Sequence, residues 1–220
     1  MVVSRKLVKV INFMEADGQI GGHVKSGCET PIGRRTGQPM ALVSALPLEP
    51  GSDRMVVTFL DRSSPVETFD NMPHEGDNAV LIMPREEVKL SAVKGVNPGD
   101  WRGAKVAFGE EMEEPVDLDV DPSGLDLEAS DAWVDMVDEI GCDCSKWGGY
   151  PLWANAPLDI DGLVGKPMRF HHRITGDLVD LGLGDGGVVY VFVAVDGSCG
   201  AVCWQESGGG AERSYSMWDD

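Results

Sequence analysis

The chain has 220 residues, of which 42% are hydrophobic and 25% are charged, as in an ordinary globular protein. Its formal net charge is -19, from 37 acidic and 18 basic side chains. A surface this acidic repels phosphate backbones and anionic membranes, and it attracts basic proteins. Composition therefore argues against a nucleic-acid binder and a membrane-surface protein, while 28 glycines and 13 prolines favour many short elements joined by turns.

The cellular compartment is predicted from the N-terminus and the cysteines. Residues 1–14 mix Arg5, Lys6 and Lys9 into an apolar stretch, without the apolar core and cleavage site of a signal peptide. No apolar run approaches the length of about 18 residues that a membrane span needs. The five cysteines are odd in number and unevenly placed, which favours reduced thiols. We expect a cytoplasmic protein.

The first predicted module covers residues 1–110 and has a dense pattern of glycines and apolar runs. Gly21-Gly22 is followed by the tetrad Gly37-Gln38-Pro39-Met40 and the apolar segment 41–46. A turn at 50–53 then leads to the apolar segments 55–60 and 79–83. These segments are rich in β-branched and aromatic residues and are bounded by turn formers, so they predict strands.

The middle of the chain is predicted to be an acidic linker, residues 111–129, that joins two modules. The run from 110 to 128 carries nine acidic and no basic residues and includes Pro115 and Pro122. Such a run is typical of an exposed connection. The following segment predicts a helix over 131–140, because Trp133, Val137 and Ile140 share one face.

The second predicted module, residues 130–220, repeats the order of the first. Gly148-Gly149 lies 148 − 21 = 127 residues after the first glycine pair, and the tetrad Gly165-Lys166-Pro167-Met168 lies 165 − 37 = 128 residues after the first tetrad. The segment 169–174 and the predicted strands 188–195 and 201–204 follow in the same order. The sequence predicts a β-rich α+β fold built from two diverged copies of one module, packed about a pseudo-twofold axis.

One stretch of the second module resembles a known family. Trp147-Gly148-Gly149-Tyr150-Pro151-Leu152-Trp153 precedes the tetrad, and Gly184-Asp185-Gly186-Gly187 leads into Val188-Val189-Tyr190-Val191-Phe192. This order resembles the YwqG-like family of bacterial proteins, which implies a duplicated α+β fold and no established chemistry. Some members look like neighbours of toxin genes, so the resemblance also suggests an immunity protein. The chain departs from the family at Arg173, where the family pattern has Gln, and this departure puts any ligand role of that Gln in doubt.

The candidate binding residues are aromatic, basic and acidic side chains of the second module. Trp147, Tyr150 and Trp153 would form a recognition surface, or else they pack between the copies. The second group is His171, His172, Arg173 and Asp185. In a regular strand the rings of His171 and His172 point to opposite faces, so they would not bind one metal ion together. The glycine-rich loop 182–187 leads into a strand and contains an acid, which indicates a tight turn rather than a phosphate loop.

The cysteines define a metal hypothesis. Cys142, Cys144, Cys199 and Cys203 would supply four thiolates to Zn²⁺, although the one-residue spacing of the first pair is tighter than usual. The alternative is that these thiols are buried and bind nothing.

No nucleophile elbow or zinc-protease motif is present, so no catalytic residue is assigned. The leading interpretation is a non-enzymatic protein that binds a basic protein, with an immunity protein against a basic toxin domain as its most specific form. The alternative is a small-molecule or metal-binding protein, which could be an enzyme, with its site in a cleft between the copies. The sequence leaves the oligomeric state open.

Overall fold

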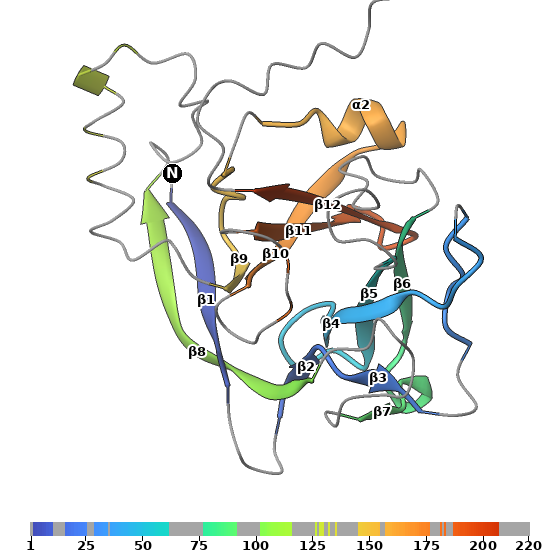
Figure 1. Cartoon of the computed structure of the whole chain (residues 1–220). Helices are drawn as coiled ribbons and strands as arrows, with labels where there is room; N and C mark the ends of the chain where they lie inside the picture. The colour runs from blue at the N-terminus through green and yellow to red at the C-terminus, as the bar shows by residue number, and fades with distance from the viewer. Residues whose placement is uncertain are drawn as a thin grey trace, which may run out of the picture.

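The structure is a computed structural model. It describes residues 2–10, 16–25, 29–34, 36–61, 77–91, 102–115, 145–154, 157–176 and 187–206, and the single positions 126, 128, 129, 132, 135, 181 and 183. These residues form a curved ten-stranded antiparallel sheet and a two-stranded sheet (Figure 1). The ten strands have the order β12-β11-β10-β9-β1-β8-β2-β4-β5-β6.

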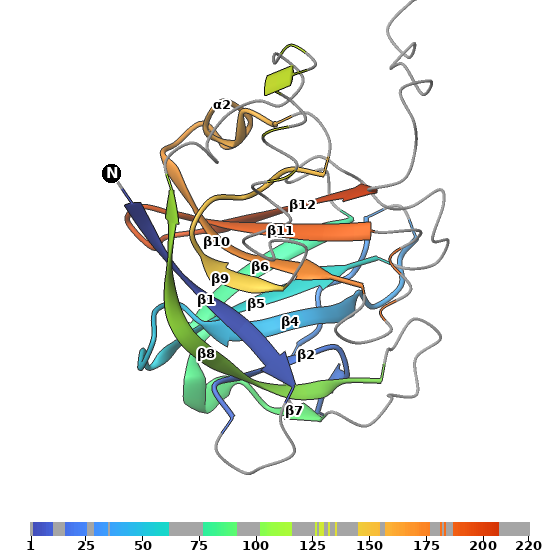
Figure 2. The same cartoon turned by 90° about the vertical axis from the view of Figure 1, so that its left-hand side faces the viewer.

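The ten-stranded sheet has a central pair of long strands with four strands on either side. The central pair is β1 (Val2–Val10) and β8 (Ala104–Pro115), which run antiparallel (Figure 2). The first half of the sheet contains β2 (Gly18–Ile20), β4 (Ala41–Pro47), β5 (Arg54–Leu60) and β6 (Asn78–Pro84). The second half contains β9 (Lys146–Gly148), β10 (Met168–Thr175), β11 (Gly187–Ala194) and β12 (Gly200–Glu206).

Small elements lie beside each half. The 3₁₀ helix η1 (Arg85–Glu87) follows β6, and β3 (His23–Val24) pairs with β7 (Leu90–Ser91) in the two-stranded sheet. The helix α2 (Ile160–Val164) precedes β10; its N-cap is Asp159, and it ends at Gly165 in the left-handed conformation. Such short elements fit the high content of turn-forming residues.

The two halves of the sheet pack face to face across one core. β6 and β12, which end the strand order, contact each other, so the curved sheet returns on itself. The inner faces of both halves contribute to a central cluster of buried aliphatic side chains that includes Val43, Val56, Val189, Val191 and Val202. Each Å² of apolar surface buried on these faces stabilises the fold by about 25 cal/mol, and this burial provides most of the favourable free energy of folding.

The outer face of each half has its own apolar cover. In the first half, β4 and β5 pack against side chains from β3, β6 and β7 and against Val88. In the second half, β11 and β12 pack against Trp153, Leu158 and α2. Each half is therefore buried on both faces, which explains why β4 and β11 are buried along their whole length.

Both halves contain the same irregularity at the same place. The β4–β5 register shifts between Leu42 and Ser44, and the β10–β11 register shifts between Phe170 and His172. The spacing is identical, since 170 − 42 = 128 and 172 − 44 = 128. The pairs Gly21-Gly22 and Gly148-Gly149 all have positive φ, between 63° and 83°. A β-bulge adds one residue to a strand and places two consecutive side chains on one face.

The strands predicted at 55–60, 79–83, 188–195 and 201–204 are confirmed as β5, β6, β11 and β12. The predicted linker differs, because its first residues, up to Pro115, continue β8. The register places them opposite β1, with Glu111 across from Lys6 and Glu113 across from Ser4. A strand partner therefore overrides the local preference of an acidic segment. The helix predicted over 131–140 lies largely outside the described residues; Ala132 and Asp135 are described and are helical.

Candidate functional site

The three aromatic candidates do not share one surface. Trp147 packs into the central core, with its ring 5.7 Å from that of Phe108. Trp153 lies on the opposite face of the second half, where its ring centroid is 4.8 Å from Tyr190 and 5.6 Å from Phe192. Tyr150 is half-buried in the segment between them. Trp147 and Trp153 therefore close two different apolar layers.

His171 and His172 both point into the core, so the expectation that their rings lie on opposite faces was wrong. The bulge in β10 turns them to the same side, and their Nδ1 atoms are 2.5 Å apart. The Nε2 atom of His172 is 2.8 Å from the hydroxyl of Ser44 in the other half. Both imidazoles are buried, and they join the two halves of the sheet rather than lining an open cleft.

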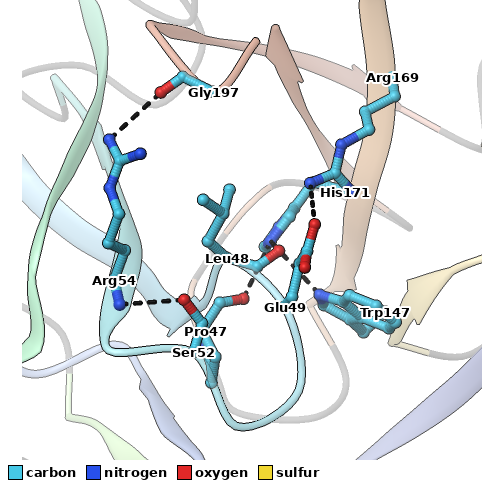
Figure 3. A network of polar contacts seen from close by, with 9 residues as sticks. All are labelled: Pro47, Leu48, Glu49, Ser52, Arg54, Trp147, Arg169, His171 and Gly197. Atoms are coloured by element: carbon cyan, nitrogen blue, oxygen red, sulfur yellow. Dashed lines mark hydrogen bonds and ion pairs between the residues drawn. The ribbon is translucent and has the colours of Figure 1, made fainter. Parts of the chain in front are cut away.

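The surrounding acceptors fix where the protons of this pair lie. His171 Nε2 is 3.0 Å from the carbonyl of Pro47 and 3.2 Å from that of Leu48 (Figure 3). A carbonyl only accepts, so His171 Nε2–H donates and its Nδ1 is an acceptor. His172 Nδ1–H then donates to His171, and Ser44 donates to His172 Nε2. The Trp147 indole N–H also faces His171 Nε2 at 3.3 Å, but two carbonyl acceptors at 3.0 and 3.2 Å outweigh this one donor and favour the tautomer with a proton on Nε2.

Burial keeps both imidazoles neutral. Desolvation lowers the pKa of His171 to about 3, the hydrogen bond to Pro47 opposes this, and the nearby Arg169 guanidinium adds to it. Desolvation and the neighbouring His171 also hold the pKa of His172 well below its usual value. Arg169 itself pairs with Glu49 of the other half, N to O 3.2 Å (Figure 3). The histidine pair is thus a neutral, hydrogen-bonded link between the two halves of the sheet.

The remaining predicted residues are spread over the second half. Arg173 is buried on the outer face, with its guanidinium carbon 5.9 Å from the centroid of the Tyr190 ring. Asp185, Cys142 and Cys144 lie outside the described residues. Cys203 is buried in the outer layer of the second half, and desolvation raises the pKa of its thiol. Over the described part of the chain, no three His, Cys, Asp or Glu side chains converge on a possible metal position.

A cavity that the sequence did not predict opens on the outer face of the first half. It has a volume of about 420 Å³, within the range of ligand-binding cavities. Its floor is formed by β5 and β6, and one side is formed by η1 and the segment that follows it. We name it the apolar cavity; it is lined by Val24, Glu29, Val57, Phe59, Leu81, Met83, Glu86, Glu87, Val88, Lys89 and Leu90.

At the matching place in the second half, Trp153 lies over β11. Val57 and Phe59 of β5 correspond in register to Tyr190 and Phe192 of β11, since Leu42 pairs with Phe59 as Phe170 pairs with Phe192. The Trp153 ring stacks on Phe192 and is tilted against Tyr190.

The chain has no match among protein-family models and none among curated proteins. Within the described residues, no helix is long and apolar enough to cross a membrane.

Proposed function

We propose that this protein is a non-enzymatic binding protein, and that its apolar cavity receives an apolar side chain from a basic protein partner. One observation carries the proposal: the outer layer of the first half contains a cavity over β5, at the place where Trp153 lies over β11 in the second half. A cavity of this size accommodates one large aromatic or aliphatic side chain. Buried aromatic and aliphatic anchors in pockets contribute most of the affinity of many protein interfaces.

Charge supports a basic partner. Glu29, Glu86 and Glu87 line the apolar cavity together with a single basic residue, Lys89. They add to the field of a chain with net charge -19, which speeds association with a cationic protein and excludes acidic ones. The most specific form of the proposal is an immunity protein that occupies a basic toxin domain.

An internal duplication accounts for the similarity of the halves. Lys146 and Arg173 pair across β9 and β10 as Gln19 and Ala45 pair across β2 and β4. The shared bulge and the shared positive-φ glycines support a common origin. The central strands add to this, because β1 pairs with β9 of the second half and β8 pairs with β2 of the first half. Membership of the YwqG-like family is part of this proposal and rests on the motifs of the sequence.

The alternative, a small-molecule or metal site between the copies, has less support. His171 and His172 are core residues that are already hydrogen-bonded to Ser44 and Pro47. Two of the four proposed zinc ligands lie outside the described residues, and a third, Cys203, is buried in an apolar cluster.

Two exposed leucines provide a matched test of the apolar cavity. Leu81 lines the apolar cavity and is 37% exposed, whereas Leu163 lies on α2 and is 42% exposed. We expect the tagged wild-type protein and Leu163→Asp to capture one basic protein from the native host at low salt. Leu81→Asp should weaken capture by about tenfold or more, because a carboxylate replaces an apolar contact.

The same capture experiment is then repeated at high salt. High salt should weaken the complex, since it screens the attraction between opposite charges. Equal capture by Leu81→Asp and Leu163→Asp would contradict the assignment of the apolar cavity, and recovery of an acidic partner would contradict the charge argument.

A further inference from the structure

A second cavity lies beside the apolar cavity and has the opposite electrostatic character. Its volume is about 410 Å³, and it shares Val88, Lys89 and Leu90 with the apolar cavity. Four of the chain's 18 basic side chains line it: Lys25, Arg85, Lys89 and Lys105. We name it the basic cavity. Such a convergence is unexpected in a chain with net charge -19.

The fold holds these cations together through its backbone. The amide of Lys25 donates to the carbonyl of Lys89, 2.8 Å, at the end of the β3–β7 ladder. Lys105 lies on β8 at the same cavity. Lys25 and Lys89 lie opposite each other at the end of this ladder, and like charges in opposite positions destabilise a strand pair in the absence of an anion. In agreement, burial and the Lys25 ammonium lower the pKa of Lys105.

The cations lack acidic partners in the described part of the chain. Asp17 is the one acidic residue that lines the basic cavity, and its carboxylate accepts from the backbone N–H of Phe108, 2.7 Å. Arg85 instead donates to the backbone carbonyl of Asp17, 3.4 Å. Among the described residues, Lys25, Lys89 and Lys105 form no ion pair. The charge of the basic cavity is therefore available to a ligand.

We propose that the basic cavity binds a small phosphate-bearing molecule through Lys25, Arg85, Lys89 and Lys105. Lysine and arginine are the usual phosphate ligands, and several charge-assisted hydrogen bonds can form at once in a concave site. The surrounding negative field selects against long polyanions such as nucleic acids, whose further phosphates would approach acidic surface. Met55, Val88 and Leu90 give this cavity an apolar side, against which a nonpolar group attached to the phosphate can pack.

Pyrophosphate is the probe for this site. We expect saturable binding by calorimetry and an increase in Tm with pyrophosphate, compared with sodium chloride at equal ionic strength. Lys105→Gln and Lys89→Gln should each weaken pyrophosphate binding by about tenfold. Lys166→Gln is the control, because Lys166 is exposed and contacts Ser198 in the second half. Without pyrophosphate, Lys105→Gln should be at least as stable as the wild type, since the substitution removes a repulsion.

Three results would overturn the proposal. The first is a Tm that does not respond to pyrophosphate beyond the sodium chloride control. The second is equal affinity for pyrophosphate in Lys105→Gln and Lys166→Gln. The third is tighter binding of a single-stranded oligonucleotide than of pyrophosphate, which would contradict a small ligand. The apolar-cavity variant Leu81→Asp should bind pyrophosphate as the wild type does, so failure of the proposed protein partner and failure of this site are distinguishable.

Discussion

We expect the free energy of unfolding to fall by about 1.4 kcal/mol per pH unit for each of His171 and His172 as the pH drops below about 6.5. The folded state holds both imidazoles neutral, mainly by burial, and lowers the pKa of His171 to about 3. The unfolded chain binds protons with the ordinary histidine pKa of about 6.5. The unfolded state therefore binds more protons in this window, and stability increases with pH.

The pH range over which these histidines change the stability has two limits. Above about pH 6.5 both states are neutral at these positions, and the contribution is fully present. Below about pH 3 the folded protein also protonates His171, and further acidification no longer changes the contribution of this residue.

Urea unfolding at pH 7.5 and pH 5.5 measures this dependence. His171→Gln keeps a donor for the carbonyl of Pro47 and removes one titrating group, so the loss of stability between the two pH values should be smaller than in the wild type. His172→Gln provides a second variant at the same site. An unchanged pH dependence in both core variants would show that the histidine pair is not neutral in the folded state.

Trp153→Ala should destabilise the protein by about 3 kcal/mol. The indole stacks on Phe192 and packs against Tyr190, and its removal leaves a cavity over β11 like the one over β5. The cost has two parts, the lost burial of the ring and the contacts that its neighbours lose.

Chemical unfolding of the variant, with Leu163→Ala as control, measures this effect. Leu163 is an exposed apolar residue near the same outer layer, so its truncation should cost under about 1 kcal/mol. Equal losses for the two variants would mean that Trp153 does not fill the outer layer of the second half, and the contrast with the cavity in the first half would lose its basis.

The sequence predicted the strands of both halves because their signal is local. Segments such as 55–60 and 188–195 are β-branched or aromatic and are bounded by turn residues, so each is recognisable without its neighbours. The strand that ends at Pro115 was missed because its composition indicates a loop and only pairing with β1 makes it a strand. Pairing over such a separation is not visible in a local window.

The site residues were harder to predict because they depend on register. A single bulge in β10 decides that His171 and His172 share a face, and an alternating strand pattern cannot reveal it. The apolar cavity depends on which side chains pack over β5. It is recognised by comparing the two halves and not from a local motif. The basic cavity joins Lys25, Arg85, Lys89 and Lys105, residues from separate elements that the sheet topology brings together.

The most direct test of the apolar cavity is a titration with the peptide Lys-Trp-Lys, followed by NMR of labelled methionine methyl groups. Met83 lines the apolar cavity, whereas Met168 packs against the apolar cluster on the outer face of the second half. We predict a saturable shift of the Met83 methyl and none at Met168, with the Met83 shift lost in Leu81→Asp. An unchanged Met83, or equal shifts at both methionines, would contradict the proposal that this cavity is a recognition site for a basic partner.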